Sequence, residues 1–124
     1  MARIQVIDHS EAEGRLKEIY DDLLNRRGKL AEVHKIQSLR PESIVHHMDL
    51  YMEIMYSKSE LTRAEREMMG VVVSAANGCS YCVKHHSQAV LPYWKDQHKV
   101  EGLADNYRQL SLNEREEKLL AFIF

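Results

Sequence analysis

The chain has 124 residues, a length that suits one domain spanning residues 1–124. With 44% hydrophobic and 29% charged residues, its composition is that of a globular protein and excludes a disordered, collagen-like or disulfide-rich chain. Seventeen basic and nineteen acidic side chains give a formal charge of −2 without a long block of either sign, so we expect no binding to nucleic acid or to an anionic membrane.

Two helices are predicted in the first half of the chain. Ser10 and Glu13 match a capping box, and an apolar period of 3.6 residues follows as far as Gly28, which offers a left-handed stop. Pro41 suits a first helical position, and a second apolar face continues from there to about Tyr56.

The third predicted helix carries the most apolar segment of the sequence. Thr62 and Glu65 form a second capping box, and the helix is expected to end at Ala76, before Asn77-Gly78. Its second half, MMGVVVSAA, is apolar on every side, so we expect it to lie in the core.

The fourth predicted helix begins at Cys79 or Ser80. We expect it to stop near Leu91-Pro92, because proline disfavours a helical conformation in the residue before it. A C-x-x-C pair therefore lies at the N-terminus of a helix.

Two more helices complete an all-α fold. One is predicted within 95–107, and a third capping box, Ser111 with Glu114, opens the last helix. That helix runs into LLAFIF without a polar terminator, which suggests a C-terminally truncated chain. The pattern L-[ST]-x-x-E-R-E occurs at 61–67 and again at 110–116; two capping boxes explain it, and a duplicated helical unit is the alternative.

Cys79 and Cys82 are the only cysteines in the chain. The sequence lacks an N-terminal hydrophobic signal core and any apolar stretch near the roughly 20 residues of a membrane span, so we expect a cytoplasmic protein. In a reducing cytosol such a pair is more often catalytic or metal-binding than structural.

Reactive side chains gather around this pair. Cys79, Cys82 and His86 share one helix face, where a neutral imidazole can take a thiol proton while the helix N-terminus favours a thiolate. Glu67 enters an apolar run on the preceding helix, and its face continues through the small residue Gly70. If the two helices pack antiparallel, Glu67 approaches His86, raises the basicity of the ring and fixes its tautomer.

The spacing Glu67-x11-Cys79-x2-Cys82-x3-His86 resembles the signature of the AhpD-like alkylhydroperoxidases in the carboxymuconolactone decarboxylase superfamily. The segment SAANGCSYCVKHH, with SLRPES at 38–43, is most similar to the peroxidase-related branch. The resemblance covers most of the chain and is strongest over 61–89. It implies an AhpD-like helical bundle, homo-oligomeric assembly and reduction of hydroperoxides.

Site roles follow from this resemblance. Cys82 would attack the peroxide, Cys79 would resolve the product, and Glu67 with His86 would relay protons. In many dithiol sites the more N-terminal cysteine is the nucleophile, but the i+4 placement of His86 favours Cys82. Tyr81 stands where a histidine often occurs in the family, and its phenol is a candidate hydrogen-bond donor to bound peroxide.

The resemblance also implies the partners. No metal and no organic cofactor is expected, and the disulfide would be recharged by an external dithiol, such as a lipoyl or thioredoxin-like electron donor.

Several alternatives remain open. Glu67 has a simpler reading as a solvated carboxylate paired with Arg63, four residues earlier. One alternative interpretation of the two cysteines is an inert buried pair at a helix start. Another is a zinc site, in which they bind the metal with His86 and a fourth ligand from His46 or His47. Alternative functions are a lyase like carboxymuconolactone decarboxylase, which needs no dithiol, and a non-catalytic redox-sensing module.

Overall fold

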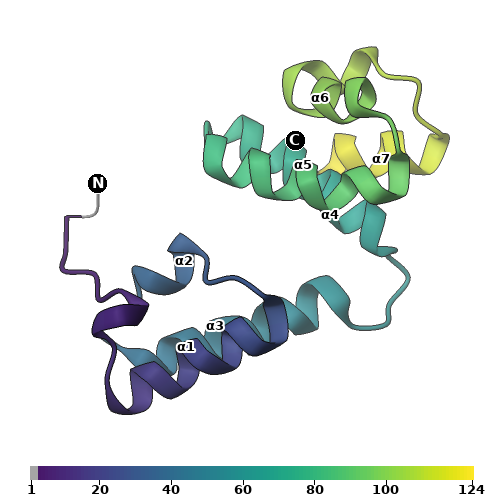
Figure 1. Cartoon of the computed structure of the whole chain (residues 1–124). Helices are drawn as coiled ribbons and strands as arrows, with labels where there is room; N and C mark the ends of the chain where they lie inside the picture. The colour runs from purple at the N-terminus through teal and green to yellow at the C-terminus, as the bar shows by residue number, and fades with distance from the viewer. Residues whose placement is uncertain (1–2) are drawn as a thin grey trace. The chain divides into compact units, whose positions relative to one another are not determined.

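The computed structural model describes residues 3–124, and within them the secondary structure is entirely helical (Figure 1). The predicted all-α fold is confirmed. The elements in chain order are η1 (His9–Glu11), α1 (Gly14–Arg27), α2 (Glu32–Lys35), α3 (Pro41–Tyr56), α4 (Arg63–Ala76), α5 (Ser80–Trp94), α6 (Gln97–Asn106), η2 (Tyr107–Gln109) and α7 (Glu114–Ile123). No helix in residues 3–124 is long and apolar enough to cross a membrane.

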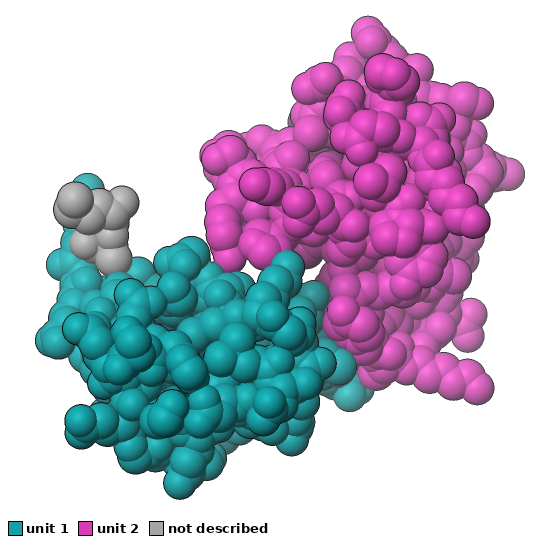
Figure 2. All heavy atoms as spheres, in the orientation of Figure 1, with its two compact units in different colours: residues 1–54 teal, residues 55–124 magenta. Residues whose placement is uncertain are grey.

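The chain divides into two compact units, residues 1–54 and 55–124, coloured separately in Figure 2. The first unit has its own core, in which the wholly buried side chains of Tyr20 from α1 and Ile44 from α3 belong to one hydrophobic cluster. That residues 1–124 act as one domain stays a prediction.

The second unit is built around α4. This helix packs mainly against α5 and also contacts α6 and α7. The predicted burial of its apolar second half is only partly confirmed, because Val73 remains 38% exposed and Ala76 is exposed as well. The fully buried side chains of this core are Met68, Val71, Val72, Val90, Val100, Leu103 and Leu120.

The start of α1 differs from its prediction. The helix begins at Gly14 after Glu13, whereas Ser10 lies in the short 3-10 helix η1, so the predicted capping box is wrong. Gly14 adopts a φ of +51°, and this left-handed residue interrupts any continuous helix from Ser10. The predicted stop at Gly28 is confirmed, with a φ of +70°. The short helix α2 was not predicted.

Helix α5 continues past the predicted stop and includes Pro92. Proline removes one N–H from the helical ladder, and near the C-terminus of a helix that loss affects a single hydrogen bond. The helix closes instead at Lys95, whose φ is +52° and whose N–H donates to the carbonyl of Leu91 at 2.8 Å.

Helix α7 is capped by Asn113, so the predicted cap at Ser111 is wrong. Asn113 Oδ1 accepts from the N–H of Glu116 at 2.9 Å, and Glu116 Oε2 accepts from the N–H of Asn113 at 3.0 Å. The later start leaves Leu112 in the connection, where it packs against the core. Because the caps are Thr62 and Asn113, the two L-[ST]-x-x-E-R-E segments do not begin their helices in the same register.

Candidate active site

The capping box at the start of α4 is formed as predicted. Thr62 N–H donates to Glu65 Oε2 at 2.7 Å, and Glu65 N–H donates to Thr62 Oγ1 at 3.2 Å. A hydrogen bond from Arg115 lowers the pKa of the Glu65 carboxyl, against the opposing effect of burial. The anionic cap fixes the register of α4 and thus the position of Glu67 in its second turn.

A tight C-terminal motif joins α4 to α5. Gly78 has a φ of +66°; its N–H donates to Ala75 O at 3.0 Å, and the N–H of Cys79 donates to Ser74 O at 2.9 Å. This hydrogen-bond pair is a Schellman motif, which depends on a left-handed residue that glycine supplies readily. The motif ends one helix and delivers Cys79 directly to the start of the next.

The two cysteines form a disulfide, with a Cα–Cα distance of 5.3 Å. Cys79 is the N-cap of α5, and its sulfur accepts a hydrogen bond from the N–H of Cys82 at 3.3 Å. Both residues are partly exposed. The prediction that the pair lies at a helix N-terminus is confirmed.

Glu67 and His86 meet between α4 and α5. The carboxylate is only 1% exposed, and its Oε2 lies 2.6 Å from Nδ1 of His86, whose side chain is 27% exposed. The expected approach of these residues is therefore confirmed. Because His86 follows Cys82 by one helical turn, the two side chains share one face of α5.

Arg63 occupies the other oxygen of the same carboxylate. Its Nη2 forms an ion pair with Glu67 Oε1, which has no directional hydrogen bond among the described residues. The sequence presented the Arg63 pair and the His86 contact as alternatives, whereas the structure contains both. The solvated Glu67 of the simpler alternative is wrong, because the carboxylate is buried.

Gly70 provides the space for the imidazole. A Cβ atom added at this position would lie 2.6 Å from Nδ1 of His86 and 2.9 Å from Cε1. Only a residue without a side chain lets the ring reach Glu67 across the helix. The small residue on the Glu67 face was visible in the sequence, but its contact with His86 was not.

A family model supplies the identification. The model of the carboxymuconolactone decarboxylase family matches residues 45–122. The chain belongs to this family. The AhpD-like resemblance is confirmed by solved structures with the same helical fold.

Two of these structures are of uncharacterized peroxidase-related proteins. The protein from Ralstonia eutropha JMP134, described as an alkylhydroperoxidase AhpD core, is 26% identical with a TM-score of 0.82 over 97% of this chain. The protein from Silicibacter sp. TM1040 is 28% identical with a TM-score of 0.80, and the match covers 98% of this chain and 67% of that one. The chain spans 63% of the length of the Ralstonia protein.

A third structure shares the fold alone. The alkylhydroperoxidase AhpD core from Rhodospirillum rubrum ATCC 11170 is 23% identical with a TM-score of 0.67, over 93% of this chain and 96% of that one. No curated protein sequence matches this member of the family.

Other predicted or possible site residues lie outside the Glu67–His86 pair. The ring of Tyr81 is exposed and packs against the ring of His85, with centroids 4.4 Å apart. His47, considered as a zinc ligand, lies with its Nδ1 2.7 Å from Nε2 of Gln37. Within residues 3–124, no three histidine, cysteine or acidic side chains gather as a metal site.

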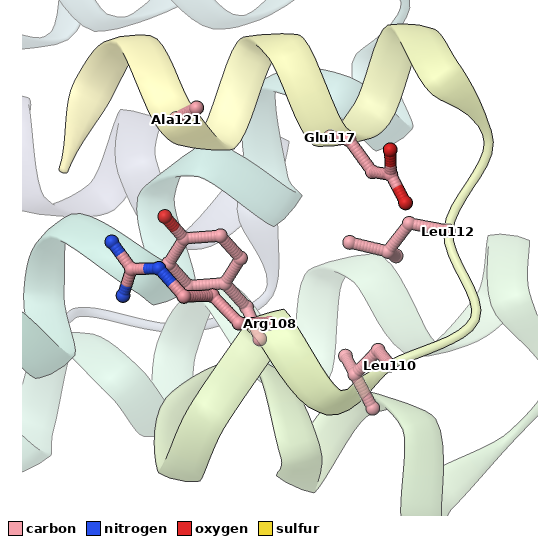
Figure 3. Close-up of a pocket in the computed structure, with 6 residues that line it drawn as sticks. Arg108, Leu110, Leu112, Glu117 and Ala121 are labelled. Atoms are coloured by element: carbon pink, nitrogen blue, oxygen red, sulfur yellow. The ribbon is translucent and has the colours of Figure 1, made fainter.

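A shallow depression occurs elsewhere in the second unit (Figure 3). Its lining residues come from η2, α7 and the connection between them, and none of them is a predicted site residue: Tyr107, Arg108, Leu110, Leu112, Glu117 and Ala121. The guanidinium of Arg108 lies over the rings of Tyr107 and Phe124. The depression is therefore separate from the disulfide and from the Glu67–His86 pair.

Proposed function

We propose that this AhpD-like protein is a thiol-dependent peroxidase that reduces hydroperoxides through the Cys79–Cys82 pair. The observation that carries the proposal is a partly exposed disulfide at a helix N-terminus, backed by a hydrogen-bonded histidine and a buried glutamate. The descriptions of the Ralstonia and Silicibacter proteins as peroxidase-related support it.

The first step consumes the peroxide. In the reduced protein, His86 takes the proton of Cys82, and the resulting thiolate attacks the terminal oxygen of the hydroperoxide. The O–O bond breaks, the leaving alkoxide receives the proton from His86, and the products are an alcohol and a sulfenic acid on Cys82.

The second step regenerates the disulfide. Cys79 attacks the sulfenic sulfur, an S–S bond forms, and the departing hydroxide takes the thiol proton to leave as water. An external dithiol then reduces the disulfide by two thiol exchanges and is itself oxidised to a disulfide. The cycle requires no metal and no organic cofactor, and a lipoyl or thioredoxin-like group is the class of donor we propose.

The assignment of Cys82 as the attacking residue depends on proton transfer. His86 lies one turn after Cys82 and is held by Glu67, so a base is available to that thiol. Cys79 is the cap residue, and its sulfur already faces the N–H of Cys82. This geometry suits a resolving residue that reaches Cys82 with little backbone movement. We further propose that Tyr81 donates to bound peroxide.

Turnover separates this function from its alternatives. Reduced protein is treated with one equivalent of an organic hydroperoxide, and free thiols and intact mass are measured before and after. We expect two thiols to be lost, with a mass decrease of two hydrogens, and continued peroxide consumption when excess dihydrolipoamide is added.

Each alternative gives a different result. A sensor would oxidise once and show no peroxide turnover with the dithiol, and a lyase like carboxymuconolactone decarboxylase would leave both thiols reduced.

Cys79→Ser should stop at a sulfenic acid on Cys82 that a dimedone probe traps, whereas Cys82→Ser should not react. Trapping of the acid on Cys79 instead would reverse the two roles.

A further inference from the structure

The two oxygens of Glu67 serve two different partners. Oε2 faces Nδ1 of His86, and Oε1 faces the guanidinium of Arg63, whose side chain is 16% exposed. The guanidinium of an arginine carries only hydrogen-bond donors and a permanent positive charge, so the oxygen that faces it serves as an acceptor. Arg63 therefore acts on the same group that contacts the histidine.

Arg63 is held in place by groups other than Glu67. Its Nη1 donates to the carbonyl oxygen of Met55 at 2.8 Å, and its Cζ lies 3.6 Å from the ring centroid of Tyr56. Met55 is in the last turn of α3, where carbonyl oxygens lack partners within the helix and a cation is favoured. The guanidinium is thus fixed on three sides, by a carbonyl, an aromatic face and the carboxylate.

The charge of Glu67 decides which nitrogen of His86 carries the hydrogen. An ionised carboxylate can only accept, so a neutral ring facing it must donate from Nδ1–H, which leaves Nε2 with a free lone pair. A protonated carboxyl group would instead donate to Nδ1, and the neutral ring would then carry its hydrogen on Nε2. Only the first arrangement leaves Nε2 able to take a proton.

We propose that Arg63 is a positioning residue of this site: by keeping Glu67 an acceptor, it holds His86 in the Nδ1–H tautomer and leaves Nε2 as the base. The use of that base on Cys82 rests on the proposed peroxidase function. The tautomer itself does not, because it exists in the protein without peroxide.

The tautomer is measured by long-range proton–nitrogen NMR of protein labelled with ¹⁵N-histidine, with His86 assigned by its absence from a His86→Gln sample. Arg63→Gln removes the charge and keeps a side-chain donor, while Arg63→Lys restores the charge. Arg115→Gln is the matched control, because it removes another arginine–glutamate pair, the one between Arg115 of α7 and Glu65 of α4. Cys82 alkylation in the reduced proteins, followed by mass spectrometry, is the second readout.

We expect wild type, Arg63→Lys and Arg115→Gln to show the Nδ1–H form. Arg63→Gln should shift His86 toward the Nε2–H form and alkylate at a rate between wild type and His86→Ala, which should lose on the order of 100-fold. A folded Arg63→Gln with an unchanged tautomer would overturn the proposal. If that variant does not fold, an Nε2–H ring in Arg63→Lys would overturn it as well. If Arg63→Gln shifts the tautomer but the wild-type protein turns over no peroxide, the proposed function is refuted and the role of Arg63 is retained.

Discussion

Replacement of Gly70 by alanine tests the packing that holds His86 against Glu67, the pair that we propose as a proton relay. The new Cβ would lie 2.6, 2.8 and 2.9 Å from Nδ1, Cγ and Cε1 of His86, closer than real Cβ contacts allow. The ring has to move, and the 2.6 Å contact between Nδ1 and Glu67 Oε2 is then lost. A single methyl group thus separates the histidine from its carboxylate.

The expected effects on stability and on reactivity differ widely. Overpacking costs about 1–3 kcal/mol, and alanine recovers about 1 kcal/mol because glycine is a poor helix former, so the free energy of unfolding should fall by about 0–2 kcal/mol. Loss of a positioned base should slow alkylation of Cys82 at neutral pH on the order of 100-fold. Equilibrium urea unfolding and timed alkylation of the reduced protein measure the two quantities.

Gly102→Ala is the control for crowding. Its Cβ would lie 2.5 Å from Cδ2 of Leu110, so it adds a comparable contact in α6 and the same helix-forming gain. Because Cδ2 of Leu110 is the tip of a flexible side chain, we expect an equal or smaller loss of unfolding free energy and no change in the alkylation rate. If Gly70→Ala reacted as fast as wild type, the claim that Gly70 positions His86 would fail.

Other predictions address the relay, the first unit and assembly. Glu67→Gln should alkylate at a rate between wild type and His86→Ala, and the double variant should be little slower than His86→Ala because the residues act as one unit; additive losses would separate them. Burial lowers the pKa of His34 from 6.5 to about 4, helped by the nearby charges of Arg27 and His47. The unfolded chain therefore binds the proton first as the pH falls, and urea unfolding should show about 3 kcal/mol of stability lost between pH 6.5 and pH 4, but not in His34→Phe. Exposed apolar side chains such as Met52 and Phe122 favour self-association, so light scattering at micromolar concentration should detect an oligomer, and a monomer would contradict this.

Local signals in the sequence predicted much of the fold. The reciprocal cap at Thr62, the proline at the first position of α3 and Gly28 each act within one helical turn, and the structure agrees with all three. The predicted caps at Ser10 and Ser111 were wrong because each helix begins later in the chain. Gly14 is left-handed and interrupts a helix from Ser10, and Asn113 caps the last helix in place of Ser111.

Helical spacing in the sequence predicted which residues form the candidate site. The spacing of Glu67, Cys79, Cys82 and His86 places these residues on two adjoining helices, and their packing brings the acid to the imidazole. Spacing alone does not indicate that one carboxylate serves two partners through separate oxygens. From the sequence, a pair of Glu67 with Arg63 and a contact of Glu67 with His86 are alternatives. The structure shows that the buried carboxylate makes both contacts.

The position of Cys79 as the N-cap of α5 links helix stability to electron transfer. In the disulfide its sulfur accepts the N–H of Cys82, and after reduction the same place is occupied by a thiol or thiolate. A thiolate there faces the positive end of the helix, which favours the reduced form over the disulfide. By thermodynamic linkage every 1.4 kcal/mol of such preference raises the reduction potential by about 30 mV. Under the proposed function, the first turn of α5 therefore sets how readily the disulfide is reduced by a dithiol.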